Sequence, residues 1–326
     1  MAHLKASKMK IKISVILCTY NGEGFVENCL NSILSQTYKN FEVLCLDGGS
    51  SDKTKEIIKH FSSTDKRVKF LINKKRFPDG KGFGKWFGGT IAKGDIIAHI
   101  DQDNILQDKD LFKKAVEIHR KEKNLIGVLA GLKHDSNDAR IVRYVALVGT
   151  DSFFAYRSLD FLRNLNSNVK SVEKFKISLD NTTITGGNCF FYSKKGLDSV
   201  GGYDRDTLCI PRLIKKGRDR VFVINDATKH YAEKSLPSLI KKKIFWALKY
   251  SGRNSEEKAN YFPRTATERN AFFKNVGFNL LILPNLHSSL KLYARSKDTI
   301  SFLFPLMAFI NTSAYVLWFI KEKILN

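Results

Sequence analysis

Two carboxylates stand close together where an apolar segment of the chain ends. Residues 96–104 read IIAHIDQDN, so Asp101 and Asp103 follow a run of strand character with only Gln102 between them. On an extended chain, side chains at i and i+2 point to the same side. Two carboxylates placed in this way can share one hard divalent cation, or divide between a cation and a sugar hydroxyl. The competing interpretation is a solvated turn in which an aspartate caps the next helix.

Elements that would position these acids alternate along the first hundred residues. Strand and helix patterns follow one another in the order strand 11–20, helix 23–36, strand 41–47, helix 50–61, strand 68–72 and strand 95–100. This alternation predicts an α/β fold with a mostly parallel sheet, helices on both faces and ligands at the carboxyl ends of the strands. Unusual polar residues fall at those ends, which predicts one common crevice: Thr19, Tyr20, Asn21, Asp47, Asp101 and Asp103.

Four segments of the chain together resemble the inverting glycosyltransferase family 2. They are SVILCTYNGEGFVENCLNSILSQTY at 14–38, DGGSSDKT at 47–54, GTIAKGDIIAHIDQDN at 89–104 and TGGNCFFYSKKGLDSVGGYD at 185–204. Their order and separation match the family as well as their letters do. The resemblance covers most of residues 11–235. It implies the GT-A fold, a Rossmann-like nucleotide-binding half with a mostly parallel sheet, and metal-dependent inverting transfer from a nucleotide sugar.

The resemblance further implies which residues bind the nucleotide sugar. They are Thr19, Tyr20, Asn21, Glu23, Asp47, Lys85 and Asp101. Among them Asp47 would meet the base, Asp101 the ribose or the metal-bound diphosphate, and Lys85 the phosphates. Lys85 could equally be a solvated lysine in a glycine-rich loop. Trp86 departs from the family, whose members commonly carry asparagine there, and this leaves the course of loop 80–88 open.

A divalent cation, Mg²⁺ or Mn²⁺, is the cofactor that the resemblance implies, with Asp103, Asp101 and His230 as its ligands. Reaction chemistry points the same way. Breaking a bond between sugar and phosphate creates a dianionic leaving group, and a cation anchored by carboxylates stabilises that charge as it develops. For His230 the alternative is a structural role, which is the commoner one for a single histidine beside a tyrosine.

The acceptor side differs from the usual family pattern. Relatives place an acidic pair after the GGYD motif, whereas this chain reads YDRDTLCIPRLIKKG, with Arg205 where the first acid commonly stands. Inverting transfer to a hydroxyl requires a carboxylate within hydrogen-bond reach of it. We therefore take Asp206 as the first candidate for the catalytic base and Asp204 as the second. Asp206 could instead cap the following helix, and Pro211 early in that helix is compatible with this.

A strong positive charge and an apolar C-terminal segment indicate a membrane partner. The 326 residues carry a formal net charge of +23, concentrated between positions 205 and 298, which predicts an anionic partner. Residues 299–320 contain no charge and are long enough to cross a bilayer, although Pro305 and the polar residues 311–313 also suit a buried hairpin.

Three regions follow from these patterns. We predict a catalytic domain at 1–235, basic amphipathic helices in the membrane interface at 236–298, and a transmembrane or membrane-anchoring helix at 299–326. The alternative for 236–298 is ordinary amphipathic helices that pack on the sheet. Scattered single cysteines and an N-terminus without a long apolar run favour a reducing cytosol for the catalytic part.

The expected function combines these features. It is transfer of a sugar from a UDP- or GDP-linked donor to a hydroxyl of a lipid-linked, polyprenyl glycan acceptor, on the cytoplasmic side of the cell membrane. The alternative is a polyprenyl-phosphate glycosyl synthase, whose anionic acceptor needs no base. Nucleic acid is not an expected partner, because no nucleic-acid-binding module is recognisable. A dinucleotide oxidoreductase is disfavoured because CTYNGEG, not G-x-G-x-x-G, follows the first strand.

Overall fold

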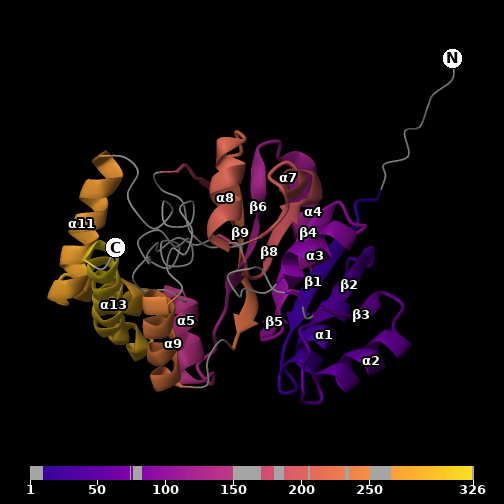
Figure 1. Ribbon diagram of the computed structural model, residues 1–326, viewed down its shortest axis with the longest axis horizontal. Coiled ribbons are helices and arrows are strands. Elements are labelled where there is room, and N and C mark those ends of the chain that lie inside the picture. The colour runs from indigo at the N-terminus through magenta and orange to yellow at the C-terminus, as the bar shows by residue number, and fades with distance from the viewer. Residues whose placement is uncertain are drawn as a thin grey trace.

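A computed structural model of the protein describes residues 10–73, 75, 83–149, 170–179, 187–204, 206–231, 235–249 and 266–324. Within these residues a nine-stranded sheet runs through the molecule. Its strands are β1 (Ile13–Thr19), β2 (Phe41–Asp47), β3 (Val68–Ile72), β4 (Ile96–Asp101), β5 (Asn104–Leu106), β6 (Leu125–Leu132), β7 (Val172–Lys176), β8 (Phe190–Ser193) and β9 (Arg220–His230). They lie in the order β3-β2-β1-β4-β8-β6-β9-β5, and β7 pairs with β9 (Figure 1).

The first four strands form the parallel sheet that the sequence predicts. β1 pairs in parallel with both β2 and β4, and β2 pairs in parallel with β3. β6 and β9 are also parallel, whereas β8, β5 and β7 are antiparallel to their neighbours. The predicted α/β class with a mostly parallel sheet is therefore confirmed, with antiparallel strands in its second half.

Helices cover both faces of this sheet. One face carries α1 (Val26–Leu34), α2 (Thr54–Thr64) and α4 (Leu111–Lys121), and the other carries α3 (Gly84–Ile91), α7 (Lys194–Asp198) and α8 (Asp206–Lys215). Residues of β1 alternate between the two cores, because successive side chains of a strand point to opposite faces. Val15 and Leu30 of α1 belong to one core, while Ile16 and Leu213 of α8 belong to the other.

A third core joins the C-terminal helices to a helix from the middle of the chain. Its elements are α5 (Arg140–Val148), α9 (Leu236–Lys249), α12 (Asn285–Ser296), the 3₁₀ helix η2 (Thr299–Leu303) and α13 (Phe304–Ile324). A further helix, α11 (Ala266–Leu281), lies against α13. Tyr144 of α5, Leu239 of α9 and Met307 of α13 are buried together in this core. The domain division at residue 235 stays a prediction, but α5 packs with the helices beyond that boundary.

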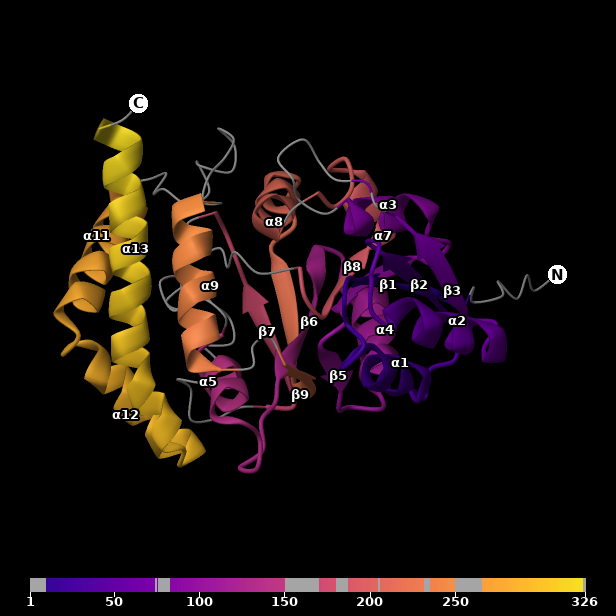
Figure 2. The same cartoon turned by 60° about the horizontal axis from the view of Figure 1, so that its bottom comes forward.

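The C-terminal helices lie on the side of the molecule away from β1, β2 and β3, and both views show α9 beside α13 (Figures 1 and 2). Thr299–Lys321, 23 residues, is long and apolar enough to cross a membrane by length and composition. Of its most apolar window, 56% is buried against the rest of the molecule. This segment is therefore also part of a packed helical unit.

Candidate functional site

Strand register brings the predicted polar residues to one edge of the sheet. Thr19 at the end of β1 lies opposite Asp47 at the end of β2, and Cys18 lies opposite Asp101 at the end of β4. Ends of parallel strands meet in this way because every strand runs in the same direction. The edge expected to bind ligands in an α/β sheet is therefore the one that collects these side chains.

Asp47 is directed into the loop that follows β2. Its carboxylate is fully buried, with Oδ1 accepting from the backbone N–H of Gly49 and of Ser50 at 2.9 and 2.8 Å. Oδ2 accepts from the hydroxyl groups of Ser50 and of Thr19, the latter at 3.1 Å. Asp47 thus shapes the loop. A contact with a nucleotide base, as predicted from the sequence, would require some of these bonds to open.

Asn21 and Glu23 tie the loop after β1 to the start of α2. Asn21 has a φ of +46°, a left-handed conformation that asparagine tolerates, and its Oδ1 accepts from the Ser51 N–H at 2.9 Å. The Glu23 carboxylate accepts from the Lys53 N–H at 3.0 Å. Both side chains therefore have structural partners, whereas Tyr20 beside them is 57% exposed and presents an aromatic surface at this edge.

Gln102, the residue between the two acids, is a site residue that the sequence analysis missed. Its Oε1 accepts from the backbone N–H of Tyr20, and its Nε2 donates to the Tyr20 carbonyl, each at 3.0 Å. A Cβ atom on Gly22 would lie only 2.2 Å from Gln102 Oε1. The amide therefore joins the ends of β1 and β4. The sequence signal that could have identified it is the alternation of side chains on an extended chain, which points Gln102 away from Asp101 and Asp103.

Asp101 forms an ion pair with Lys85, a residue of α3. Lys85 Nζ lies 2.9 Å from Asp101 Oδ1, and it also donates to the Gly187 carbonyl. The Lys85 side chain is 19% exposed and its ammonium group lies 6.0 Å from the centre of the Tyr203 ring. The alternative of a solvated lysine is therefore wrong for this structure. Lys85 and Asp101, which were predicted to serve the same phosphates, lie side by side.

Asp103 pairs with His230 at the end of β9. His230 Nε2 lies 3.4 Å from Asp103 Oδ2, and the Tyr231 N–H donates to the Asp103 carbonyl at 2.9 Å. Burial of the carboxylate acts to raise its pKa, but the hydrogen bond and charge of His230 outweigh this and hold the pKa of Asp103 below its usual value. Asp103 is therefore an ionised acceptor fixed by its neighbours.

The predicted metal ligands fit a hard cation in their chemistry. Asp101 and Asp103 supply the carboxylate oxygens that Mg²⁺ and Mn²⁺ prefer, and the lowered pKa keeps Asp103 ionised. In the described part of the chain, however, no group of three or more His, Cys, Asp or Glu side chains is arranged to hold a metal ion. Here Lys85 and His230 stand next to the two carboxylates, so a cation would compete with Lys85 for Asp101.

On the acceptor side, Asp204 is held by Arg212 of α8. Arg212 Nη1 donates to Asp204 Oδ2 at 3.1 Å, and Asp204 Oδ1 is buried without a hydrogen-bond partner among the described residues. Asp206 is the first residue of α8, and its side chain lies outside the described residues. The structure thus gives a partner to the second candidate base and is silent on the first.

Trp86 connects α3 to the turn that carries the GGYD motif, residues 201–204. Its Nε1 donates to the Gly201 carbonyl at 3.3 Å. A Cβ atom on Gly202, whose φ is +87°, would lie 3.2 Å from the indole ring. The departure from the family at this position is therefore a packing contact between α3 and the GGYD turn. Residues 80–82, at the start of loop 80–88, lie outside the described residues.

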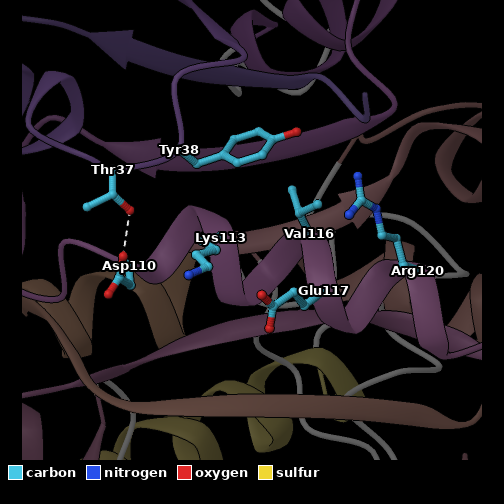
Figure 3. A pocket seen from close by; sticks show the side chains of 7 residues that line it. All are labelled: Thr37, Tyr38, Asp110, Lys113, Val116, Glu117 and Arg120. Carbon is cyan, nitrogen blue, oxygen red and sulfur yellow. Dashed lines mark hydrogen bonds between the residues drawn. The ribbon is translucent and has the colours of Figure 1, made fainter. Parts of the chain in front are cut away.

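A surface hollow elsewhere does not collect any of the candidate residues. It is lined by Thr37, Tyr38, Asp110, Lys113, Val116, Glu117 and Arg120 (Figure 3). Thr37 and Tyr38 precede β2 and Asp110 precedes α4, which places the hollow at the amino ends of the strands, opposite the candidate site. We therefore assign it no part in the chemistry at the carboxyl ends.

Comparison with known proteins identifies the family. A family model described as glycosyl transferase family 2 matches residues 14–201, more than half of the chain. The chain belongs to glycosyltransferase family 2. This assignment confirms the resemblance drawn from the four sequence segments.

Similar proteins agree with this family membership. Glycosyltransferase GlyA from Streptococcus pneumoniae is 31% identical over 47% of this chain and 21% of GlyA. A GalNAc(5)-diNAcBac-PP-undecaprenol beta-1,3-glucosyltransferase from Campylobacter jejuni is 32% identical over 29% of this chain and 30% of that enzyme. The chain thus spans less than a third of either relative.

A solved structure supports the fold over nearly the whole chain. The mannosyltransferase PcManGT from Pyrobaculum calidifontis, in complex with GDP-Man and Mn²⁺, superposes with a TM-score of 0.59 at 14% identity. The match covers 98% of this chain and 89% of PcManGT. At this identity the likeness establishes the fold alone, and the GT-A architecture predicted from the sequence is confirmed.

Proposed function

We propose that this member of glycosyltransferase family 2 moves a sugar from a UDP- or GDP-linked donor, with inversion, to a hydroxyl of a lipid-linked polyprenyl glycan. The reaction would take place on the cytoplasmic side of the cell membrane, with an anionic membrane surface as a further partner. One observation carries the donor side of this proposal. At the carboxyl ends of the parallel strands, the Lys85–Asp101 and His230–Asp103 pairs lie at one edge, in a chain of this family.

The residues at this edge suit departure of a nucleoside diphosphate. Lys85, held 2.9 Å from Asp101, supplies a positive charge that can turn to the phosphates as the leaving group becomes a dianion. His230 keeps Asp103 ionised and oriented. When bound, Mg²⁺ or Mn²⁺ held by Asp101 and Asp103 would add charge stabilisation for the diphosphate. The exposed ring of Tyr20 offers a stacking surface for the base.

Inversion requires the acceptor oxygen to attack the sugar from the face opposite the diphosphate. A carboxylate must accept the proton of the attacking hydroxyl while the new bond to the sugar forms. We assign the role of accepting this proton to Asp206 at the start of α8. Asp204 would position that helix, because Arg212 of α8 already occupies one of its oxygens.

The lipid-linked acceptor is supported by one relative and by the charge of the chain. The C. jejuni relative is named for an undecaprenol-linked acceptor. Net charge of +23 suits association with acidic lipid headgroups. An acceptor presented at a membrane surface would meet an enzyme that is held at the same surface.

A second candidate function is synthesis of a polyprenyl-phosphate sugar. The Arg212–Asp204 ion pair favours it, because that pair neutralises one of the two candidate bases and an anionic phosphate acceptor needs none. Replacing Asp206 by Asn separates the two functions. Turnover near the wild-type rate would support the phosphate acceptor, whereas a fall of roughly a hundredfold or more would support the hydroxyl acceptor.

The donor assignment is tested by ligand-dependent stabilisation. We expect one nucleoside diphosphate sugar in a panel to raise the Tm, and to do so more strongly with Mn²⁺ present, because a ligand that binds only the folded state stabilises it. An Asp103→Asn variant should lose the Mn²⁺-dependent part of the shift. If no nucleotide sugar raises the Tm under either condition, the proposed donor class is wrong.

A further inference from the structure

Large apolar side chains are exposed mainly on the C-terminal helices. We call the following residues of α11 to α13 the apolar shell: Phe273, Phe278, Leu280, Leu281, Ile282, Leu283, Leu286, Leu290, Tyr293, Phe302, Leu306, Leu317, Phe319 and Ile320. Leu281 and Leu283, in the turn between α11 and α12, are 67% and 72% exposed. An apolar surface of this extent marks an interaction site on a folded protein.

Buried faces of the same helices carry polar side chains. Asn279, Asn285, Ser289, Ser301, Asn311 and Thr312 are all buried. On α12, Asn285 and Ser289 face inward together with Leu292, while Leu286 and Leu290 face outward. On a soluble domain the leucines of a helix mostly face the core, and its exposed face is polar.

Three of these buried polar residues, Asn279, Asn285 and Thr312, connect the three helices to one another. Asn279 Nδ2 of α11 donates to Thr312 Oγ1 of α13 at 2.9 Å. Asn285 Nδ2 of α12 donates to Asn279 Oδ1, also at 2.9 Å. Helices surrounded by lipid associate through such hydrogen bonds, because apolar side chains gain nothing by leaving hydrocarbon for a protein interface.

From this inverted pattern we infer that α11, α12 and α13 enter the hydrocarbon of a bilayer together, as one bundle covered by the apolar shell. The occupant of this surface is lipid with anionic headgroups. The inference replaces the expected arrangement, in which residues 236–298 lie in the headgroup plane and only the last helix enters the membrane. It rests on the proposed membrane partner, but not on the proposed chemistry.

Charge on the bundle and on α9 fits anionic headgroups. Lys274, Lys291 and Arg295 are exposed on α11 and α12, on the same helices as the apolar shell. On α9, the exposed Lys241 and Lys242 precede Ile244, Phe245 and Leu248, which are exposed by 36%, 45% and 41%. Basic residues beside apolar ones are what the boundary between headgroups and hydrocarbon requires.

This arrangement sets the candidate site close to the headgroups. Tyr231, whose N–H donates to the Asp103 carbonyl at 2.9 Å, packs against the same core as Leu239 of α9. The remaining face of α9 packs inward, with Leu239 2% exposed in the core shared with α5 and α13. The third core therefore connects α9, at headgroup level, to the candidate site through Tyr231 and to the membrane bundle through α13.

Vesicle flotation of the full-length chain tests the inference. We expect the wild-type protein to float with vesicles of phosphatidylglycerol and phosphatidylcholine, and to stay bound at about 1 M salt, where headgroup attraction is screened. The double variant Leu286→Gln/Leu290→Gln should lose at least about tenfold in partition, because both side chains would leave hydrocarbon. Ile72→Gln, at a 59% exposed position on β3, is the matched control and should float like the wild type.

Each other outcome overturns the inference in a distinct way. Unchanged flotation of the double variant would mean that α12 is outside the hydrocarbon and that α13 alone anchors the chain. Release of the wild type at high salt would indicate adsorption through lysines only. Failure to float, together with a dimer that the double variant splits into monomers, would assign the apolar shell to a second copy. Nucleotide-sugar stabilisation, measured on the same samples, reports separately on the proposed function.

Discussion

At the scale of single residues, the two acids at the end of β4 have different partners and therefore different tasks. Asp101 pairs with a lysine that comes from α3, and Asp103 pairs with a histidine that comes from β9. The two acids are thus held by different parts of the fold, Asp101 by α3 and Asp103 by β9. The residue between them faces elsewhere and holds the loop after β1.

Replacing Asp103 by Ala should lower release of nucleoside diphosphate from the donor by roughly a hundredfold, with the fold retained. The reason is loss of an ionised carboxylate that acts where leaving-group charge develops. The quantity to measure is the rate of nucleoside diphosphate release at a saturating donor concentration. Asp198→Ala is the matched control, because the side chain of this aspartate of α7 is 61% exposed and pairs with Lys194 on the same helix, away from the candidate site. Equal rates in the two variants would remove Asp103 from the mechanism.

Gln102→Ala should raise the donor KM by roughly tenfold, because two hydrogen bonds that hold Tyr20 are lost. Gly22→Ala should do the same, since its new Cβ would displace the Gln102 amide. We expect the double variant to be no worse than either single one, as for two changes that break the same contact. Additive effects in steady-state kinetics would show that Gly22 and Gln102 act independently.

At the scale of elements, Glu42 joins the amino ends of the parallel strands. Its buried carboxylate accepts from Ser14 Oγ of β1 at 2.8 Å, from the Lys93 N–H at 2.9 Å and from Lys69 Nζ of β3 at 2.6 Å. Burial opposes ionisation, yet these hydrogen bonds lower the pKa of Glu42 from 4.5 to about 2. One side chain of β2 therefore fastens two strands and the loop before β4.

Stability that depends on Glu42 should be lost in acid. Because the folded-state pKa is the lower one, the stabilisation is full above pH 4.5 and disappears as the pH falls through about 2. Glu42→Gln should cost about 2 kcal/mol of unfolding free energy at neutral pH and flatten the decline between those values. Urea unfolding at several pH values measures the free energy of unfolding and its dependence on pH. Glu117→Gln, on the exposed face of α4, should leave the profile unchanged.

At the scale of the whole molecule, the third core couples the C-terminal helices to the sheet. α5 follows β6 in the chain yet packs with α9 and α13, and Tyr231 next to β9 packs against the same core. The Tyr231 N–H also donates to the Asp103 carbonyl. Packing of the helical unit and geometry of the site are therefore connected through a single residue.

Leu239→Ala should loosen this third core without unfolding the sheet. A cavity at a 2% exposed leucine costs about 2–5 kcal/mol locally. We expect faster hydrogen exchange in α5, α9 and α13 and unchanged exchange in β1 to β4, because cooperative units open separately. Leu30→Ala, in the first core, should instead raise exchange in β1 to β4. Uniform acceleration by both variants would show one cooperative unit.

The local pattern of apolar and polar residues was sufficient to predict much of the first half of the sheet. The segments 41–47 and 68–72 were predicted with the same bounds that β2 and β3 have, because short apolar runs and polar flanks are properties of the chain itself. Polar residues at strand ends likewise follow from the sequence, and parallel strands must bring such ends together. The α/β class and the shared edge of Asp47, Asp101 and Asp103 could therefore be anticipated from pattern, whereas the GT-A fold and the roles of Lys85 and His230 came from the resemblance to the family.

Tertiary packing alone decided which partner each side chain meets. Periodicity shows that α9 and α12 have apolar faces, but not that Leu239 turns inward to α5 while Leu286 and Leu290 stay outside. Spacing placed Asp47 beside the crevice, but only the loop conformation turned its carboxylate inward onto Gly49 and Ser50. The physical reason is that a residue's orientation is a local property, whereas its partner is chosen by contacts between segments distant in the chain.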